Sequence, residues 1–77
     1  MEVPIKYFGQ IAEILGLEEE TLNTEAHLVS DLVNYLYIKY PQLRQNNFKI
    51  AQNQEFVGMD TQLTGKEVAL LPPFAGG

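Results

Sequence analysis

Several residue types that commonly carry chemistry are missing from this chain or nearly so. It contains no cysteine, one histidine (His27) and one serine (Ser30). Without cysteine the chain can form no disulfide, no thiolate nucleophile and no thiolate metal site. A Ser-His-Asp triad would have to use His27, Ser30 and Asp31, at the expected start of a helix, where Ser30 and Asp31 are ordinary first-turn residues. We therefore expect neither side-chain catalysis nor a bound metal.

Basic clusters and long hydrophobic runs are also missing. Ten acidic and five basic residues give a net charge of -5, which argues against nucleic acid and anionic membranes as partners and favours a partner with a basic face. No apolar run approaches the roughly 20 residues of a membrane helix, and residues 1–4 do not read as a signal peptide, so we expect a cytoplasmic protein. The acidic stretch 18–20 with Glu25 is interpreted as a solvated face or as a surface that steers a basic partner.

A long amphipathic helix is the strongest local pattern. Apolar and aromatic residues recur at helical spacing along one stripe: Val29, Leu32, Val33, Leu36, Tyr37 and Tyr40. Pro41 disfavours the helical conformation in the residue before it, so the helix should end near Tyr40. A shorter helix is expected from Gln10, and Gly16 can end it because glycine tolerates the left-handed conformation.

The remaining segments read mainly as strands and loops. We expect strands at 3–7, 17–24, 48–52, 56–57 and 67–71, a turn at 53–55, and loops at 42–47 and 58–66 with Leu63 as an anchor. One main helix packed on one face of a mixed sheet buries these apolar faces economically, which predicts an α+β protein of the β-grasp (ubiquitin-like) type. Its first and last strands should lie parallel at the centre of the sheet. The sequence predicts one domain over residues 1–77, with a flexible C-terminal tail at 72–77.

The tail itself is the most informative motif. Gly76-Gly77 follow an apolar strand and Pro72-Pro73. Glycine has no Cβ, so this end can enter a narrow channel, and the Gly77 carboxylate is the best remaining candidate for a reactive group. The prolines fix φ and reduce the entropy lost when a partner binds the tail. Phe74 either anchors in a partner groove or packs on its own sheet.

The chain resembles the MoaD-type small subunit of molybdopterin synthase, a ubiquitin-like sulfur carrier. The resemblance is carried by residues 6–11 (KYFGQI) and 12–16 (AEILG), by the helix through Leu32, and above all by residues 67–77 (EVALLPPFAGG). Two places depart from the family pattern. Lys66 stands where an acidic residue is usual before the last strand, and Gln52 stands where an apolar residue is usual in the third strand.

The resemblance implies a specific chemistry for the tail. An adenylating enzyme related to ubiquitin-activating enzymes would use ATP transiently to adenylate Gly77, and the resulting thiocarboxylate would donate sulfur to cyclic pyranopterin monophosphate. This last step would take place in the large subunit of molybdopterin synthase, in a heterotetramer. The chain would bind no cofactor itself and would act as the sulfur-donating subunit. Pro72, Pro73, Phe74, Ala75 and Gly76 would then contact partners.

Three other functions fit the same residues. A thiamin-type sulfur carrier and a ubiquitin-like protein modifier share the fold and the Gly-Gly end, although Pro72-Pro73 disfavour the thiamin type. A plain interaction domain whose glycines form only a tail is the alternative from another class.

Overall fold

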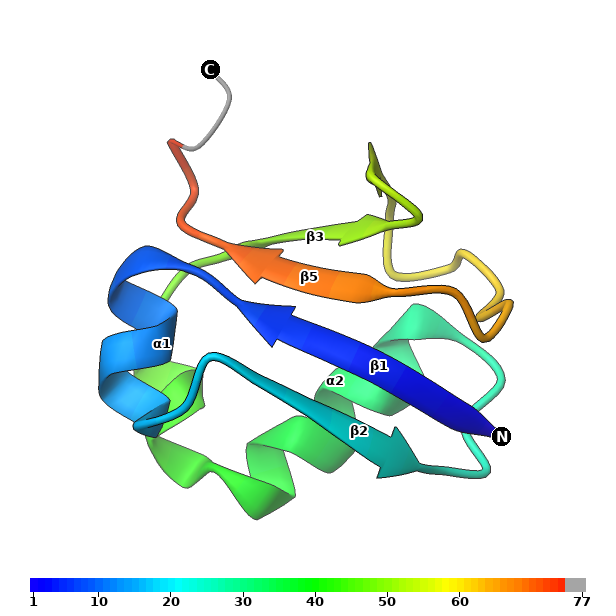
Figure 1. The fold of residues 1–77 in the computed structure, drawn as a ribbon, viewed down its shortest axis with the longest axis horizontal. Helices are drawn as coiled ribbons and strands as arrows, with labels where there is room; N and C mark the ends of the chain where they lie inside the picture. The colour runs from blue at the N-terminus through cyan, green and yellow to red at the C-terminus, as the bar shows by residue number, and fades with distance from the viewer. Residues whose placement is uncertain (75–77) are drawn as a thin grey trace.

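The computed structural model describes residues 1–74, which form one five-stranded mixed sheet with helices on one face (Figure 1). The strands lie in the order β2-β1-β5-β3-β4. β1 and β5 pair in parallel at the centre, and the other neighbours are antiparallel. The elements in chain order are β1 (Glu2–Tyr7), α1 (Gly9–Leu15), β2 (Glu19–Asn23), α2 (Val29–Lys39), the 3-10 helix η1 (Pro41–Gln45), β3 (Lys49–Gln52), β4 (Glu55–Phe56) and β5 (Val68–Leu71). The predicted β-grasp fold is confirmed.

The core lies between the sheet and α2. Alternate residues of the central strands face the helices, as the two-residue period of a strand requires. The fully buried side chains include Val3, Ile5, Val29, Leu32, Leu36, Val68 and Leu70. The predicted helical stripe supplies four of the fourteen buried residues of this core, and its last two members, Tyr37 and Tyr40, are only partly buried. In the part of the chain that the structure describes, no helix has both the length and the apolar character needed to cross a membrane.

The segment after α2 differs from the expected loop at 42–47. α2 ends at Lys39, as Pro41 predicts, but residues 41–45 then form η1. Proline fits the first position of a helix because its missing N–H would have no partner there. Leu43 is fully buried. The polar residues that predict a loop therefore lie on either side of a core residue.

The predicted turns are confirmed, with small shifts in their boundaries. Gly16 ends α1 in the left-handed conformation, with φ of 74°. Asn53 and Gln54 both have positive φ, 53° and 68°, and join β3 to β4 as a two-residue hairpin. That backbone matches the right-handed twist of the two strands. β4 consequently begins at Glu55 instead of Phe56.

Gln52 faces inward, as the predicted alternation of the third strand requires, and its polar side chain has a structural explanation. It is 7% exposed. Its amide nitrogen donates to the Gln62 carbonyl at 3.0 Å, and its amide oxygen accepts from the Thr64 backbone N–H at 3.0 Å. Leu63, between these two residues, is buried as predicted. Gln52 therefore fastens the long loop to the end of the sheet.

Candidate functional site

The base of the tail is held by the centre of the sheet. β5 lies between β1 and β3, with Ala69 paired to Lys6 on one side and to Ala51 on the other. The Phe8 backbone N–H donates to the Leu70 carbonyl at 3.1 Å, which continues the β1–β5 contact to the last residues of β5. The tail therefore starts from a strand that is hydrogen-bonded on both sides.

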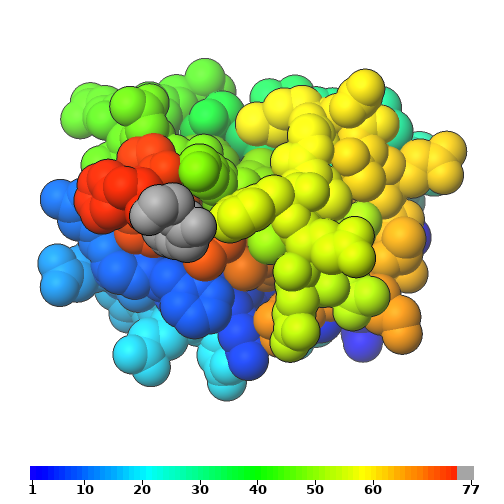
Figure 2. Space-filling model, turned by 90° about the horizontal axis from the view of Figure 1, so that it is seen from above, coloured from blue at the N-terminus to red at the C-terminus, as the bar shows by residue number. Residues whose placement is uncertain are grey.

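Pro72 is the first residue beyond β5, and it packs against the start of α1. Gly9, the first residue of α1, has φ of +55°, and a Cβ placed on it would lie 2.9 Å from Pro72 Cγ. Pro73 and Phe74 follow in a turn. Figure 2 shows the red C-terminal segment at the surface, between blue and green parts of the chain.

Phe74 is 77% exposed, so of the two predicted roles, packing on its own sheet is not observed. Its aromatic ring is therefore available to a partner. The predicted site residues Ala75, Gly76 and Gly77 lie outside the described residues. The structure therefore places Pro72, Pro73 and Phe74 together at one end of the sheet.

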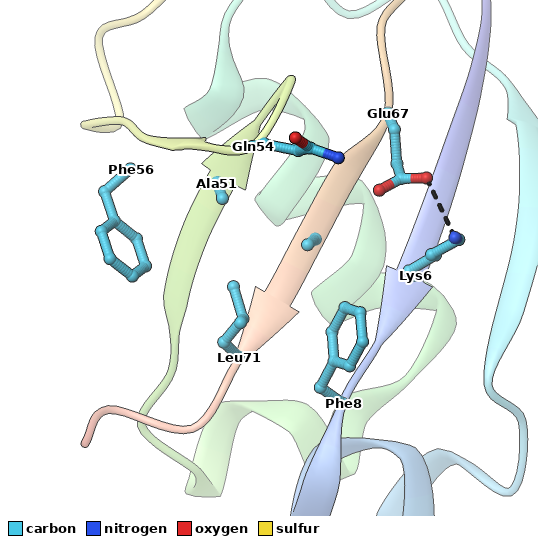
Figure 3. Close-up of a pocket in the computed structure, with 8 residues that line it drawn as sticks. Lys6, Phe8, Ala51, Gln54, Phe56, Glu67 and Leu71 are labelled. Atoms are coloured by element: carbon cyan, nitrogen blue, oxygen red, sulfur yellow. Dashed lines mark ion pairs between the residues drawn. The ribbon is translucent and has the colours of Figure 1, made fainter. Parts of the chain in front are cut away.

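A shallow groove of about 340 Å³ runs along the open face of the sheet to this end (Figure 3). Ala51 and Ala69, directly paired across β3 and β5, form its low floor. The larger side chains around them are Lys6, Phe8, Gln54, Phe56, Glu67 and Leu71. Phe8 and Leu71 stand at the end of the groove nearest the tail (Figure 3).

The groove combines an apolar interior with charges at its rim. Phe8 is 43% and Phe56 57% exposed, which leaves two aromatic rings largely open to a partner. Lys6, on β1, and Glu67, the residue before β5, form an ion pair of 3.3 Å. Both side chains are exposed, so this pair contributes at most about 1 kcal/mol to stability. The rim can therefore exchange its internal ion pair for contacts with another protein at low cost.

Sequence reasoning missed this groove. Phe8 lies just after the first predicted strand (3–7), and Phe56 lies in the short predicted strand at 56–57. The two residues lie 48 positions apart in the sequence numbering, and only the strand order brings them to one face. The period-two pattern of β5 was the available signal, since Ala69 and Leu71 must face away from the buried Val68 and Leu70.

Glu20 corrects the interpretation of the acidic stretch as a solvated face. One of its carboxylate oxygens accepts hydrogen bonds from the Tyr7 and Tyr40 hydroxyls, at 2.6 and 2.7 Å, and the other pairs with Lys39 Nζ at 2.8 Å. Burial alone would raise the pKa of Glu20, but the hydrogen bonds from Lys39 and the tyrosines outweigh it and the pKa lies below its usual range. Glu18 and Glu19 are exposed, as predicted.

The residues around His27 serve the start of α2. One Asp31 carboxylate oxygen accepts from the backbone N–H groups of Leu28 and His27, at 3.1 and 3.4 Å. The predicted first-turn role of Asp31 is thus confirmed. Within residues 1–74, no three histidine or carboxylate side chains are grouped so as to hold a metal ion.

Comparison with known proteins identifies the family. The model of the ThiS family matches residues 5–77. The chain is 31% identical to the molybdopterin synthase sulfur carrier subunit of Homo sapiens, over 99% of this chain and 94% of the relative. It is 32% identical to the subunit of the same name from Chlamydomonas reinhardtii, over the full length of both chains.

Comparison with solved structures agrees with the sequence comparison. A putative molybdopterin converting factor, subunit 1, from Pyrococcus furiosus superposes with a TM-score of 0.86 at 25% identity, covering 95% of this chain and 98% of that one. Small archaeal modifier protein 1 from Methanosarcina acetivorans superposes at 0.79 with 27% identity, covering 99% and 96%. A chain in the complex of subunits 1 and 2 of molybdopterin-converting factor from Helicobacter pylori superposes at 0.71 with 27% identity over both full chains. The chain belongs to the ThiS family, and its resemblance to the small subunit of molybdopterin synthase is confirmed.

Proposed function

We propose that this chain is the sulfur carrier subunit of a molybdopterin synthase. The observation that carries the proposal is the match, over nearly the whole length, to two relatives that bear this name. The geometry of the described tail supports it. A central strand, two prolines and an exposed Phe74 lead toward the Gly-Gly end, which suits a group that is presented to other proteins.

The reactive group in this proposal is the C-terminal carboxylate of Gly77. An α-carboxylate is ionised at neutral pH and can attack the α-phosphate of ATP in an adenylating enzyme. Pyrophosphate leaves, and the acyl adenylate has a good leaving group in AMP. A sulfur donor then displaces AMP and leaves a thiocarboxylate on Gly77. ATP is bound by the activating enzyme, and the carrier holds no cofactor of its own.

The large synthase subunit is the proposed acceptor, and it would dock on the groove. The groove ends at Phe8 and Leu71, immediately beside the tail base, so a partner that takes in the tail also covers this surface. Its alanine floor and exposed rings offer apolar area of the kind that anchors protein interfaces. We propose a heterotetramer of two carriers and two large subunits. These ATP-dependent steps belong in the cytoplasm.

A protein modifier is the second candidate. It is favoured by the likeness to small archaeal modifier protein 1 from Methanosarcina acetivorans, at 27% identity over nearly the full chain. In this case the activated Gly77 would be joined to a lysine amine on another protein. The fold and the tail serve both reactions, so the acceptor of the activated carboxyl group distinguishes them.

The proposal can be tested in cells that lack their own carrier. The full chain should restore molybdopterin synthesis, and a chain without Gly76-Gly77 should not, although its folded domain should still bind the large subunit. Retained synthesis with the truncated chain would overturn the proposal. Isopeptide-linked conjugates of the full chain, without restored molybdopterin, would favour the modifier.

A further inference from the structure

We infer that Gly9 is a positioning residue for the tail. Its missing side chain lets the Pro72 ring seat against the start of α1, and this contact fixes the direction in which the tail leaves the sheet. The consequence for sulfur transfer rests on the proposed function. The contact itself can be measured without it.

The space at Gly9 is filled by Pro72. A Cβ on Gly9 would lie 2.9 Å from Pro72 Cγ and 3.6 Å from Cδ. Carbon atoms in favourable contact lie about 3.5 to 4.0 Å apart, so the shorter distance is a clash. An alanine at position 9 could keep the present backbone only if the proline ring moved.

The backbone around Gly9 is tied down, so the proline has to yield. The Phe8 N–H donates to Leu70 at 3.1 Å, and the Ile11 N–H donates to Phe8 at 3.1 Å. The turn that carries Gly9 is thus bound to β5 on one side and to α1 on the other. Pro72 has no N–H to anchor it, and Pro73 follows it, so a shift of its ring is passed along a stiff segment to Phe74.

Two other glycines separate this effect from backbone strain. Gly16 and Gly65 also have positive φ, 74° and 88°, but a Cβ on either would meet nothing within 4 Å. Glycine at those positions is explained by φ alone. Gly9 combines a positive φ with an occupied neighbouring space. Gly16→Ala is therefore a matched control that introduces the same kind of strain without touching the tail.

A redirected tail should impair the reaction more than the fold. Misplacing a reacting group by about 1 Å can lower a rate by up to about 100-fold, so we expect Gly9→Ala to lower kcat/KM for thiocarboxylation by about tenfold. Gly16→Ala should lower kcat/KM by less than about twofold. Its unfolding midpoint should nevertheless fall about as much as that of Gly9→Ala. Pro72→Ala removes both Cγ and Cδ, so in that background the effect of Gly9→Ala should shrink to about twofold or less.

Nuclear magnetic resonance provides a readout that does not depend on sulfur transfer. Wild-type protein should show contacts between the Gly9 α-protons and the Pro72 ring, and Gly9→Ala should shift the Leu71 and Phe74 amides, whereas Gly16→Ala should not. Equal amide shifts and equal rates in the two glycine variants would overturn the inference. So would a Gly9→Ala effect that is unchanged in the Pro72→Ala background.

Two further outcomes are distinguishable. If Gly9→Ala does not fold, the Pro72→Ala variant alone tests the inference. If the ring contact orients the tail, Pro72→Ala must shift the Phe74 amide and lower kcat/KM. Normal values for both would overturn the inference. If the wild-type chain is never thiocarboxylated, the proposed function fails, and the amide shifts and ring contacts still decide whether Gly9 orients the tail.

Discussion

The Tyr7 hydroxyl donates a 2.6 Å hydrogen bond to the same Glu20 carboxylate oxygen that accepts from Tyr40 at 2.7 Å. The two tyrosine rings meet edge to face, with centroids 6.3 Å apart. Because Tyr7 lies on β1, Glu20 on β2 and Tyr40 directly after α2, this one carboxylate joins three elements. The Glu20 carboxylate thus covers the core at the edge of the sheet that β2 forms.

Removal of this carboxylate should destabilise the fold. In Glu20→Ala the two hydroxyls and Lys39 lose their acceptor, and we expect a loss of about 2 kcal/mol in the free energy of unfolding. Urea unfolding at pH 7 measures it. Glu19→Ala is the matched control, since Glu19 is an exposed neighbour on the same strand, and it should change stability by less than about 0.5 kcal/mol. Equal losses in the two variants would contradict the account of Glu20.

The hydrogen bonds and the ion pair of Glu20 should also make the stability of the fold sensitive to acid. The pKa of Glu20 in the folded state lies below its ordinary value of about 4.3. A lowered folded pKa means that the unfolded chain binds the proton more readily, so the stabilisation is complete above about pH 4.3 and is lost as the pH falls through the folded pKa. The stability gap between wild type and Glu20→Gln should be constant from pH 8 to about pH 5 and narrow at lower pH. A gap that widens on acidification would have the wrong sign.

Gln52→Leu should be destabilising although it replaces a buried polar residue with an apolar one. The Gln62 carbonyl and the Thr64 N–H would lose their partners, which predicts a loss of about 1 to 3 kcal/mol. Hydrogen exchange should report earlier opening of the loop at 58–66. Gln45→Leu, on an exposed position of η1, is the control. A Gln52→Leu variant as stable as wild type would show that the two Gln52 hydrogen bonds do not hold the loop.

Phe56→Ala should weaken binding of the large subunit without unfolding the carrier. The ring is 57% exposed and lines the groove, so its loss should cost about tenfold in Kd, or about 1.4 kcal/mol. Ile38→Ala is the control, because Ile38 is 76% exposed on α2, away from the groove. Calorimetric titration measures both. Unchanged affinity for Phe56→Ala, or an equal loss for Ile38→Ala, would place the docking surface elsewhere.

The sequence predicts the parts of this fold that depend on local periodicity. The stripe of α2, the stop at Gly16 and the alternation of β1 follow from spacing alone, and each is confirmed. η1 was missed because Leu43 is a single apolar residue among polar ones, and its burial depends on packing against other elements. A single apolar residue gives no periodic pattern from which its burial could be predicted.

In the candidate site, too, some residues could be predicted from the sequence and others could not. The prolines and Phe74 could be found from the tail motif, because their role depends on neighbours in sequence. The roles of Glu20 and Gly9 could not, since each depends on a register or a contact between distant segments. Glu20 pairs with Ile5 across β1 and β2 and therefore faces the core with Leu22, two residues on. That two-residue spacing was the one signal in the acidic run that set Glu20 apart.

The most direct test of the central claim is the intact mass of the full chain after incubation with an adenylating enzyme, ATP and a sulfur donor. We predict a gain equal to the replacement of one oxygen by sulfur, located at Gly77 and lost when the large subunit and cyclic pyranopterin monophosphate are added. A chain without Gly76-Gly77 should show no gain. An unchanged mass for the full chain, with an enzyme that forms the acyl adenylate on a known carrier, would contradict the claim that Gly77 carries sulfur.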